Sequence, residues 1–241
     1  MKEFSPMELL ERLEWRREIR NIMGRISHDY AVKQEAEVYH RYFSKREDVC
    51  LGLNDGYYKG AEAVAGYYKA LGDEIKLSSE LIQKLFPKEL GDKTEEEIYG
   101  VGMITYLPFE SQVIEIADDG QTAKGIWNVR GSTCHLTAAG PVANWIFGWA
   151  AVDFVLEAGE WKILNLLLVF NVDHQCGVPF CAEEKVFEPV PGLEAMAEFH
   201  MPAPNVPKKV FETFYPDRPK TKSPRCPEPY ESFDKTFSYG I

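Results

Sequence analysis

The chain has 241 residues, of which 45% are hydrophobic and 13% aromatic, and it carries a formal net charge of -11. A chain of this length can bury a substantial core, either as one large domain or as one domain with a long appendage. Nucleic-acid binding depends on clustered Lys and Arg, and here the basic residues are scattered along an acidic chain. We therefore expect no nucleic-acid partner.

The first residues, MKEFSPMELLERLEWRREIRN, mix charges into their apolar positions throughout, unlike a signal peptide or a membrane span. We expect a cytoplasmic protein with no membrane partner. The cysteines are odd in number and lack CxxC spacing, so neither a disulfide framework nor a zinc site is indicated. Since no HExxH, P-loop or nucleophile elbow occurs either, we predict no metal site and no cofactor.

Helical periodicity dominates the front of the chain. A second helix is predicted in KQEAEVYHRYF, and VCLGLNDGYYKG is typical of a short strand and a turn before the helix AEAVAGYYKAL. The segment 72–100, with its charged and helix-favouring residues, predicts a further helix and a solvated loop. The buried face of the first helix is predicted from apolar residues at three- and four-residue steps: Trp15, Ile19, Ile22, Ile26 and then Asp29 or Tyr30.

Two long hairpins are predicted next. The first turns at Asp118-Asp119-Gly120, and the second turns at Ala158-Gly159-Glu160 between VANWIFGWAAVDFVLEA and EWKILNLLLVFNV. Strands of this length suit the wide, curved antiparallel sheet of an α+β domain. Strict alternation would place Trp145, Trp149 and Asp153 on one face of the third long strand, and Trp161, Ile163 and Asn165 on one face of the last.

Both faces of these strands are largely apolar, which implies that a second surface buries the face that the helices leave open. The residues 176–241 are rich in proline and cannot form the interior of a sheet, but their many aromatic residues argue against disorder. We expect an extended tail that packs on its own domain, 1–175, or on a neighbouring subunit. A homodimer or higher homo-oligomer is the alternative cover for the second face.

Four local sequences carry a family resemblance: EIRNIMGRISHDY, DGYYKGAEAVAGYYKAL, DDGQTAKGIWNVRG and VDFVLEAGEWKILNL. Together they resemble the SnoaL-like branch of the nuclear-transport-factor-like superfamily over residues 10 to 172, with 72–100 as an insertion. The resemblance implies a cone-shaped, curved antiparallel sheet wrapped on N-terminal helices and enclosing a pocket. Enzymes of this kind, such as polyketide cyclases, scytalone dehydratase and ketosteroid isomerase, transfer protons on apolar cyclic substrates.

The candidate catalytic residues are Asp29, Tyr30 and His135. Scytalone dehydratase-like members carry an adjacent Tyr and Asp on the first helix, and SHDYA offers the pair in reversed order. Desolvation in an apolar cone would raise the pKa of Asp29 and make it a base, while Tyr30 would donate a hydrogen bond. Alternatively, Asp29 caps the helix, Tyr30 packs at the rim and His135 is a solvated residue near a strand end.

Further residues are expected to line the pocket. The tryptophans among them could equally belong to the core. Asn165 raises a separate question, because an unpaired buried amide costs about 1–3 kcal/mol; it could bond a ligand or pair within a dimer interface. The expected pocket residues are Ile26, Trp127, Asn128, Trp145, Trp149 and Asn165.

Two functions remain open from the sequence. The first is a cofactor-independent lyase or isomerase, of the dehydratase or cyclase kind, acting by acid/base proton transfer on a hydrophobic cyclic or aromatic carbonyl compound. The second is a non-catalytic protein that binds an apolar small molecule in the same cone, or a dimeric scaffold. The resemblance, with Asp29 and Tyr30 on the pocket side of the first helix, makes the first the leading hypothesis. The departure from the dehydratase pattern, with Trp127 and Asn128 where strand histidines are expected, motivates the second.

Overall fold

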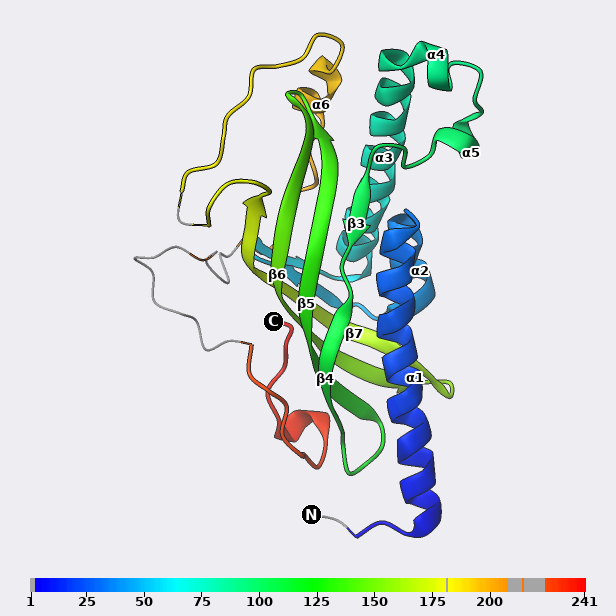
Figure 1. Cartoon of the computed structure of the whole chain (residues 1–241). Coiled ribbons are helices and arrows are strands. Elements are labelled where there is room, and N and C mark those ends of the chain that lie inside the picture. The colour runs from blue at the N-terminus through cyan, green and yellow to red at the C-terminus, as the bar shows by residue number, and fades with distance from the viewer. Residues whose placement is uncertain (1–2, 181, 208–213, 215–223) are drawn as a thin grey trace.

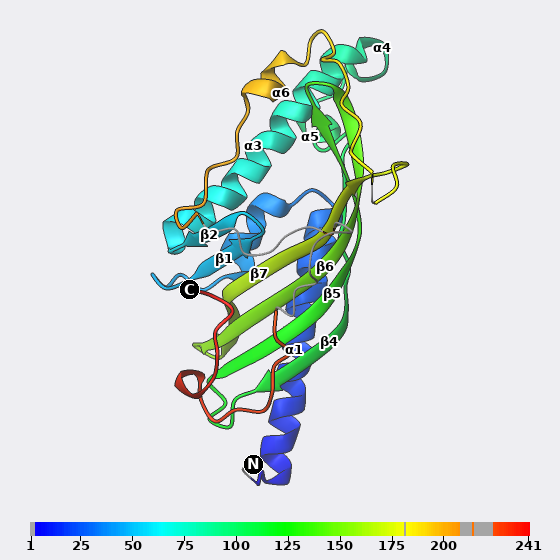
Figure 2. The ribbon, with the colours of Figure 1, turned by 90° about the vertical axis from the view of Figure 1, so that its left-hand side faces the viewer.

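A curved sheet with helices on one side forms the framework (Figures 1 and 2). The computed structural model describes residues 3–180, 182–207, 214 and 224–241, and within these ranges the sheet has seven strands in the order β2-β1-β7-β6-β5-β3, with β4 also paired to β5. The pairs are antiparallel except for β1 and β7. This is the α+β architecture that the sequence predicts, and the sheet does not close on itself.

The helices within the described ranges are α1 Pro6–Ala31, η1 Glu35–Glu37, α2 Val38–Tyr42, α3 Ala61–Leu85, α4 Pro87–Leu90, α5 Glu95–Ile98, α6 Glu194–Glu198 and η2 Phe233–Lys235. The strands are β1 Cys50–Leu53, β2 Gly56–Lys59, β3 Ile104–Tyr106, β4 Phe109–Ile116, β5 Thr122–Thr137, β6 Gly140–Glu157 and β7 Glu160–Gln175.

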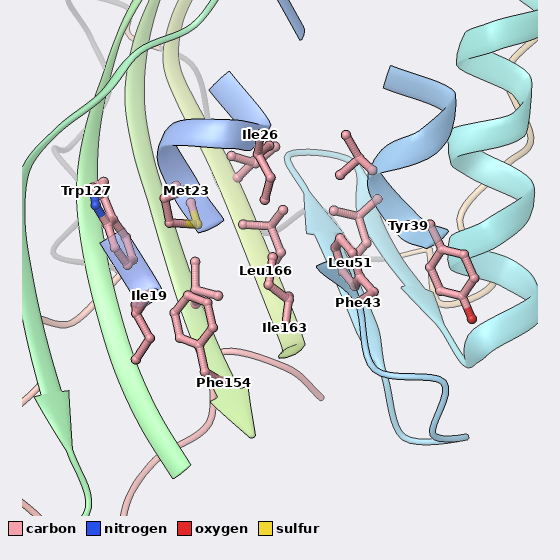
Figure 3. Close-up of a cluster of buried hydrophobic side chains, with 14 of the residues drawn as sticks. Ile19, Met23, Ile26, Tyr39, Phe43, Leu51, Trp127, Phe154, Ile163 and Leu166 are labelled. Carbon is pink, nitrogen blue, oxygen red and sulfur yellow. The ribbon is translucent and has the colours of Figure 1, made fainter. Parts of the chain in front are cut away.

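The long first helix begins where the sequence indicates. Ser5 accepts a hydrogen bond from the backbone N–H of Glu8, whose carboxylate accepts one from the backbone N–H of Ser5, and Pro6 fills the first helical position. Its inner face brings Ile19, Met23 and Ile26 against side chains of β5, β6 and β7 (Figure 3). These contacts build the main core between α1 and the concave side of the sheet.

Two boundaries differ from the sequence prediction. A single helix, α3, runs through 61–85, so the two helices expected on either side of Gly72 are one. The segment expected to link the turn at Asn54 to that helix is a strand, β2, which pairs with β1. Both differences arise from tertiary contacts: α3 packs along η1, α2 and the first hairpin, which stabilises a helix longer than its local pattern requires.

The predicted turns of the two long hairpins are confirmed, and a bulge changes the faces of β7. Ala158 and Gly159 both have positive φ, 50° and 85°, as the tightest hairpin turns require. Phe154 pairs with Ile163 but Asp153 pairs with Asn165, so Leu164 is the extra residue of a β-bulge. Strict alternation along β7 is therefore wrong, because the bulge places Ile163 in the core with the helices and Asn165 on the opposite face.

The C-terminal segment 224–241 covers that opposite face. In Figure 1 it lies on one side of the sheet and the helices lie on the other. Phe237 and Tyr239 pack in a second apolar cluster with Ala151, Leu167 and Val169. Residues 181, 208–213 and 215–223 of the predicted tail lie outside the described residues.

A buried ion pair joins this segment to the sheet. The side chains of Lys124 on β5 and Asp153 on β6 are both 0% exposed. The ammonium of Lys124 donates a hydrogen bond to Asp153 Oδ1. The other oxygen of Asp153 accepts hydrogen bonds from Asn165 Nδ2 at 2.8 Å, Ser238 Oγ at 3.0 Å and the backbone N–H of Tyr239 at 2.8 Å. Burial lowers the pKa of the Lys124 ammonium, and Asp153 opposes that shift.

Aromatic rings surround the same ammonium. The Nζ of Lys124 lies 4.8 Å from the ring centroids of Phe233 and Phe237, 5.1 Å from that of Tyr239 and 5.8 Å from that of Tyr230. Cation–π attraction stabilises a charge in this position when water is excluded. The aromatic residues of the segment thus have an electrostatic role as well as an apolar one.

Replacing Lys124 by Met should lower the free energy of unfolding by about 3–5 kcal/mol, because Asp153 is left as an uncompensated buried charge. The double variant Lys124→Met, Asp153→Asn should recover part of the loss, since the amide is neutral and keeps an acceptor oxygen. Urea unfolding followed by circular dichroism measures both, with the exposed Lys59→Met as control. A loss below about 1 kcal/mol for Lys124→Met would contradict a stabilising pair.

Candidate functional site

A cavity of about 560 Å³ lies between the helices and the concave side of the sheet. The end of α1 with η1, the inner side of α3, β3 and the end of β5 supply its walls, together with the turn after β1, one residue of β6 and three residues of β7. Much of the surface is apolar, and the apolar lining residues are Leu53, Leu71, Ile75, Met103, Ile104, Leu107, Ile146, Leu168 and Phe170. The cavity is large enough for a ligand with a ring system.

Tyrosines form one part of the wall. Tyr30 at the end of α1 and Tyr67 on α3 both line the cavity, and the hydroxyl of Tyr30 lies 3.4 Å from that of Tyr68 behind it. Burial raises the pKa of Tyr30 to about 12, and it also raises the pKa values of Tyr67 and Tyr68. These phenols therefore stay protonated near neutral pH and can act as neutral hydrogen-bond donors.

An acid and a histidine face the same space from opposite walls. Glu74 belongs to α3 and His135 to the third-last position of β5, and both line the cavity. Burial raises the pKa of the Glu74 carboxyl, while the charges of His135 and Lys33 lower it. A carboxylate with a raised pKa beside an imidazole is an arrangement that can exchange protons with a bound molecule.

A second charged group occupies another part of the wall. Lys33 Nζ lies 3.4 Å from Glu35 Oε1 and donates a hydrogen bond to Thr105 Oγ1. Both charged side chains are nearly inaccessible to solvent, Lys33 at 7% and Glu35 at 4%. Burial raises the pKa of Glu35, and the ammonium of Lys33 opposes that shift.

Asp29 does not line the cavity with its neighbour Tyr30. Its carboxylate accepts hydrogen bonds from Arg41 Nη1 at 3.0 Å and from the Tyr42 hydroxyl at 2.8 Å. These bonds join α1 to α2 and occupy both carboxylate oxygens, which leaves Asp29 without the free, desolvated carboxylate expected of a base. Among the three candidate catalytic residues, the cavity contains Tyr30 and His135.

The expected pocket residues are distributed differently. Ile26 is 0% exposed and Trp127 is 2% exposed; both belong to the buried core (Figure 3), and neither lines the cavity. Trp127 packs edge-on against Phe154, with ring centroids 6.1 Å apart. Asn128, the next residue of β5, points to the opposite face and is exposed, because side chains alternate along a strand.

The remaining pocket candidates lie on the face away from the helices. Trp145 is 45% exposed and Trp149 is partly buried, and their neighbour Ile146 is the one that lines the cavity. Asn165 donates to Asp153 and to Ser238 at 3.1 Å, so it is satisfied in the network that holds the C-terminal segment. Its amide is explained by neither a ligand nor a dimer interface.

Glu74, Tyr67, Glu35 and Lys33 were absent from the sequence-based candidates. A signal for two of them existed: Tyr67, Leu71 and Glu74 follow four- and three-residue steps on one helix, which places them on the same face. The break expected near Gly72 hid this pattern. No local signal marks Glu35, because its burial depends on Thr105, which is distant in sequence.

Within the described ranges, no cluster of three or more His, Cys, Asp or Glu side chains has the arrangement of a metal site. In the same ranges, none of the helices combines the length and the apolar character that a membrane crossing requires.

Comparisons with known proteins give distant structural likenesses. No family model matches the chain, and no curated protein does. A variant of Rv3472, a Mycobacterium tuberculosis protein of unknown function, is 13% identical over 82% of this chain and 92% of its own, with a TM-score of 0.46. A hexachlorocyclohexane dehydrochlorinase, LinA-type3 of Novosphingobium barchaimii, is 16% identical over 72% and 99%, with a TM-score of 0.45.

A protein of Novosphingobium aromaticivorans described as NTF2-like with a cystatin-like fold is 13% identical over 70% of this chain and 92% of its own, with a TM-score of 0.40. At these values the likenesses assign neither a family nor an activity. The chemistry has to be inferred from the cavity itself.

The electrostatic effect of His135 on Glu74 can be measured through the pKa of Glu74. His135→Asn removes a positive charge that lowers the pKa of Glu74, so this pKa should rise further above its ordinary range. Titration of ¹³C-glutamate-labelled protein by NMR, with the signal assigned through Glu74→Gln, provides the value. The exposed His28→Asn should leave the pKa of Glu74 unchanged. An equal shift in both variants would exclude a specific effect of His135 on Glu74.

Proposed function

We propose that this chain is a member of the nuclear-transport-factor-like superfamily, in its SnoaL-like branch, and that it acts as a cofactor-independent lyase or isomerase. Its substrate would be a small, hydrophobic cyclic or aromatic carbonyl compound bound in the cavity. The observation that carries the proposal is the placement of Glu74 and His135 on facing walls of one cavity, whose lining is mostly apolar but also includes Lys33, Glu35, Asp55 and Asp173. The order of helices before long hairpins around one curved sheet supports the superfamily assignment.

The residues have complementary roles in this reaction. Glu74, in its ionised form, removes a proton from the carbon next to the substrate carbonyl, and the electron pair of that C–H bond forms the C=C bond of an enolate. The hydroxyl of Tyr30 donates a hydrogen bond to the carbonyl oxygen as negative charge develops there. His135 in its protonated form returns a proton, or transfers one to a leaving group, which completes an isomerisation or an elimination.

The raised pKa of Glu74 fits this role. A carboxylate of ordinary pKa is a weak base near neutrality, and burial makes its conjugate base stronger. Because the ionised form is required, activity should fall as the pH is lowered through this raised pKa, at a pH above the usual glutamate range. The buried Tyr30, with a pKa of about 12, stays protonated over the same interval.

Proton exchange in deuterated water tests the assignment. The wild-type protein should accelerate exchange of the protons next to the carbonyl of 2-tetralone, followed by ¹H NMR, and Glu74→Gln should reduce that acceleration by about 100-fold or more. Glu62→Gln, an exposed change on the same helix, is the matched control.

Two outcomes would redirect the proposal. Retained exchange in Glu74→Gln together with lost exchange in Asp29→Asn would make Asp29 the base, as the sequence pattern expects. Binding of the ketone without acceleration by the wild type would favour the non-catalytic ligand-binding function.

A further inference from the structure

Lys33, Glu35 and Thr105 form a charged group in the cavity wall that the proposed reaction does not use. One oxygen of Glu35 faces the ammonium of Lys33, but the other, Oε2, is buried and has no hydrogen-bond partner. Leaving a buried carboxylate oxygen unsatisfied costs free energy that most buried polar groups avoid. A hydrogen bond donated by a bound ligand would give this oxygen a partner.

The backbone around Lys33 is shaped to hold this group. Lys33 has a φ of 62°, in the left-handed region that is unfavourable for a residue with a side chain. Its stem passes against Gly100, where an added Cβ would lie 2.5 Å from Lys33 Cγ, so only glycine leaves room for it. Lys33 is the left-handed residue that ends α1, where the backbone N–H groups of Lys33 and Gln34 bond to the carbonyl oxygens of Tyr30 and Asp29. The helix end and the contact with Gly100 together place the ammonium beside Glu35 and Thr105.

We propose that Glu35, held by Lys33 and Thr105, accepts a hydrogen bond from a hydroxyl group on a ring ligand. Glu35 lines the cavity, and the terminal torsion of a glutamate has a broad energy well, which lets the carboxylate turn to present Oε2 to a bound molecule. A neutral hydroxyl fits better than a cation, because the charge of Glu35 is already compensated by Lys33, whose ammonium would repel a second positive group. The substrate class narrows accordingly to hydroxylated rings.

This inference takes one point from the proposed function, namely that a ring compound binds in the cavity. It concerns binding at equilibrium, whereas the reaction depends on Glu74. Glu74→Gln should therefore keep the hydroxyl preference described below while losing proton exchange, so the two proposals can fail separately.

Paired naphthalene probes test the preference. The wild type should bind 2-naphthol about tenfold or more tightly than 2-methoxynaphthalene, which has the same ring but no donor, as a hydrogen bond to a charged acceptor implies. Dissociation constants come from ligand-observed NMR titration. Three outcomes with the wild type alone would overturn the proposal. They are equal affinity for the two probes, tighter binding of 2-naphthylmethylammonium than of 2-naphthol, and no binding of any probe.

The variant Glu35→Gln makes a sharper test, because Lys33 can only donate and so keeps the amide oxygen on its own side. The amide NH₂ then faces the cavity and donates. The preference for 2-naphthol should disappear, and 2-methoxynaphthalene should bind as well or better. Glu37→Gln, an exposed change in the same short helix, should behave as the wild type. If Glu35→Gln still prefers 2-naphthol, the naphthol hydroxyl donates to a group other than Glu35, and the proposal is wrong.

Discussion

The structure depends on covering the apolar part of each face of one long sheet. Helices cover the concave face, and α1 supplies its apolar side chains to the core there. The other face carries Ala151, Leu167 and Val169, which in an isolated sheet would be exposed to water. The chain covers them with its own C-terminal segment, and the bond between Lys124 and Asp153 is the interaction on which that cover depends.

A buried ion pair is a costly way to join two surfaces, because both charges lose their hydration. Here the cost is offset by several partners: Asp153 accepts three further hydrogen bonds, and aromatic rings surround the ammonium of Lys124. A segment without the aromatic residues or without Ser238 would leave the pair unsatisfied. The network therefore specifies which segment binds and in which register, where apolar contacts alone would permit several.

The concave face holds the charged groups of the cavity. The cavity keeps charged groups of alternating sign within reach of one another, since Lys33 acts on the pKa values of both Glu35 and Glu74, and His135 acts on that of Glu74. Isolated charges would be neutralised in such a space, but a chain of opposite charges can remain ionised. Within this row of charged side chains, Glu74 is the proposed base and Glu35 is the proposed acceptor of the ligand hydroxyl.

Much of the architecture was predictable from the sequence, because helix periodicity, hairpin turns and apolar strands are encoded over a few neighbouring residues. The positions of Tyr30 and His135 follow from such local patterns. The tertiary structure alone decided which face Asn165 occupies: the bulge at Leu164 transfers it from the expected pocket to the ion-pair network.

Tertiary structure also decided which carboxylates line the cavity. Asp29 is bound by Arg41 and Tyr42, whereas Glu74 and Glu35 line the cavity, and these outcomes depend on how α1, α2, α3 and β3 meet. The sequence by itself determined the helices, the hairpins, the two apolar faces of the sheet and the need for a second cover. Contacts between distant segments determined the cover, the bulge and the site, because side-chain burial and partner choice are set by packing and cannot be read from neighbouring residues.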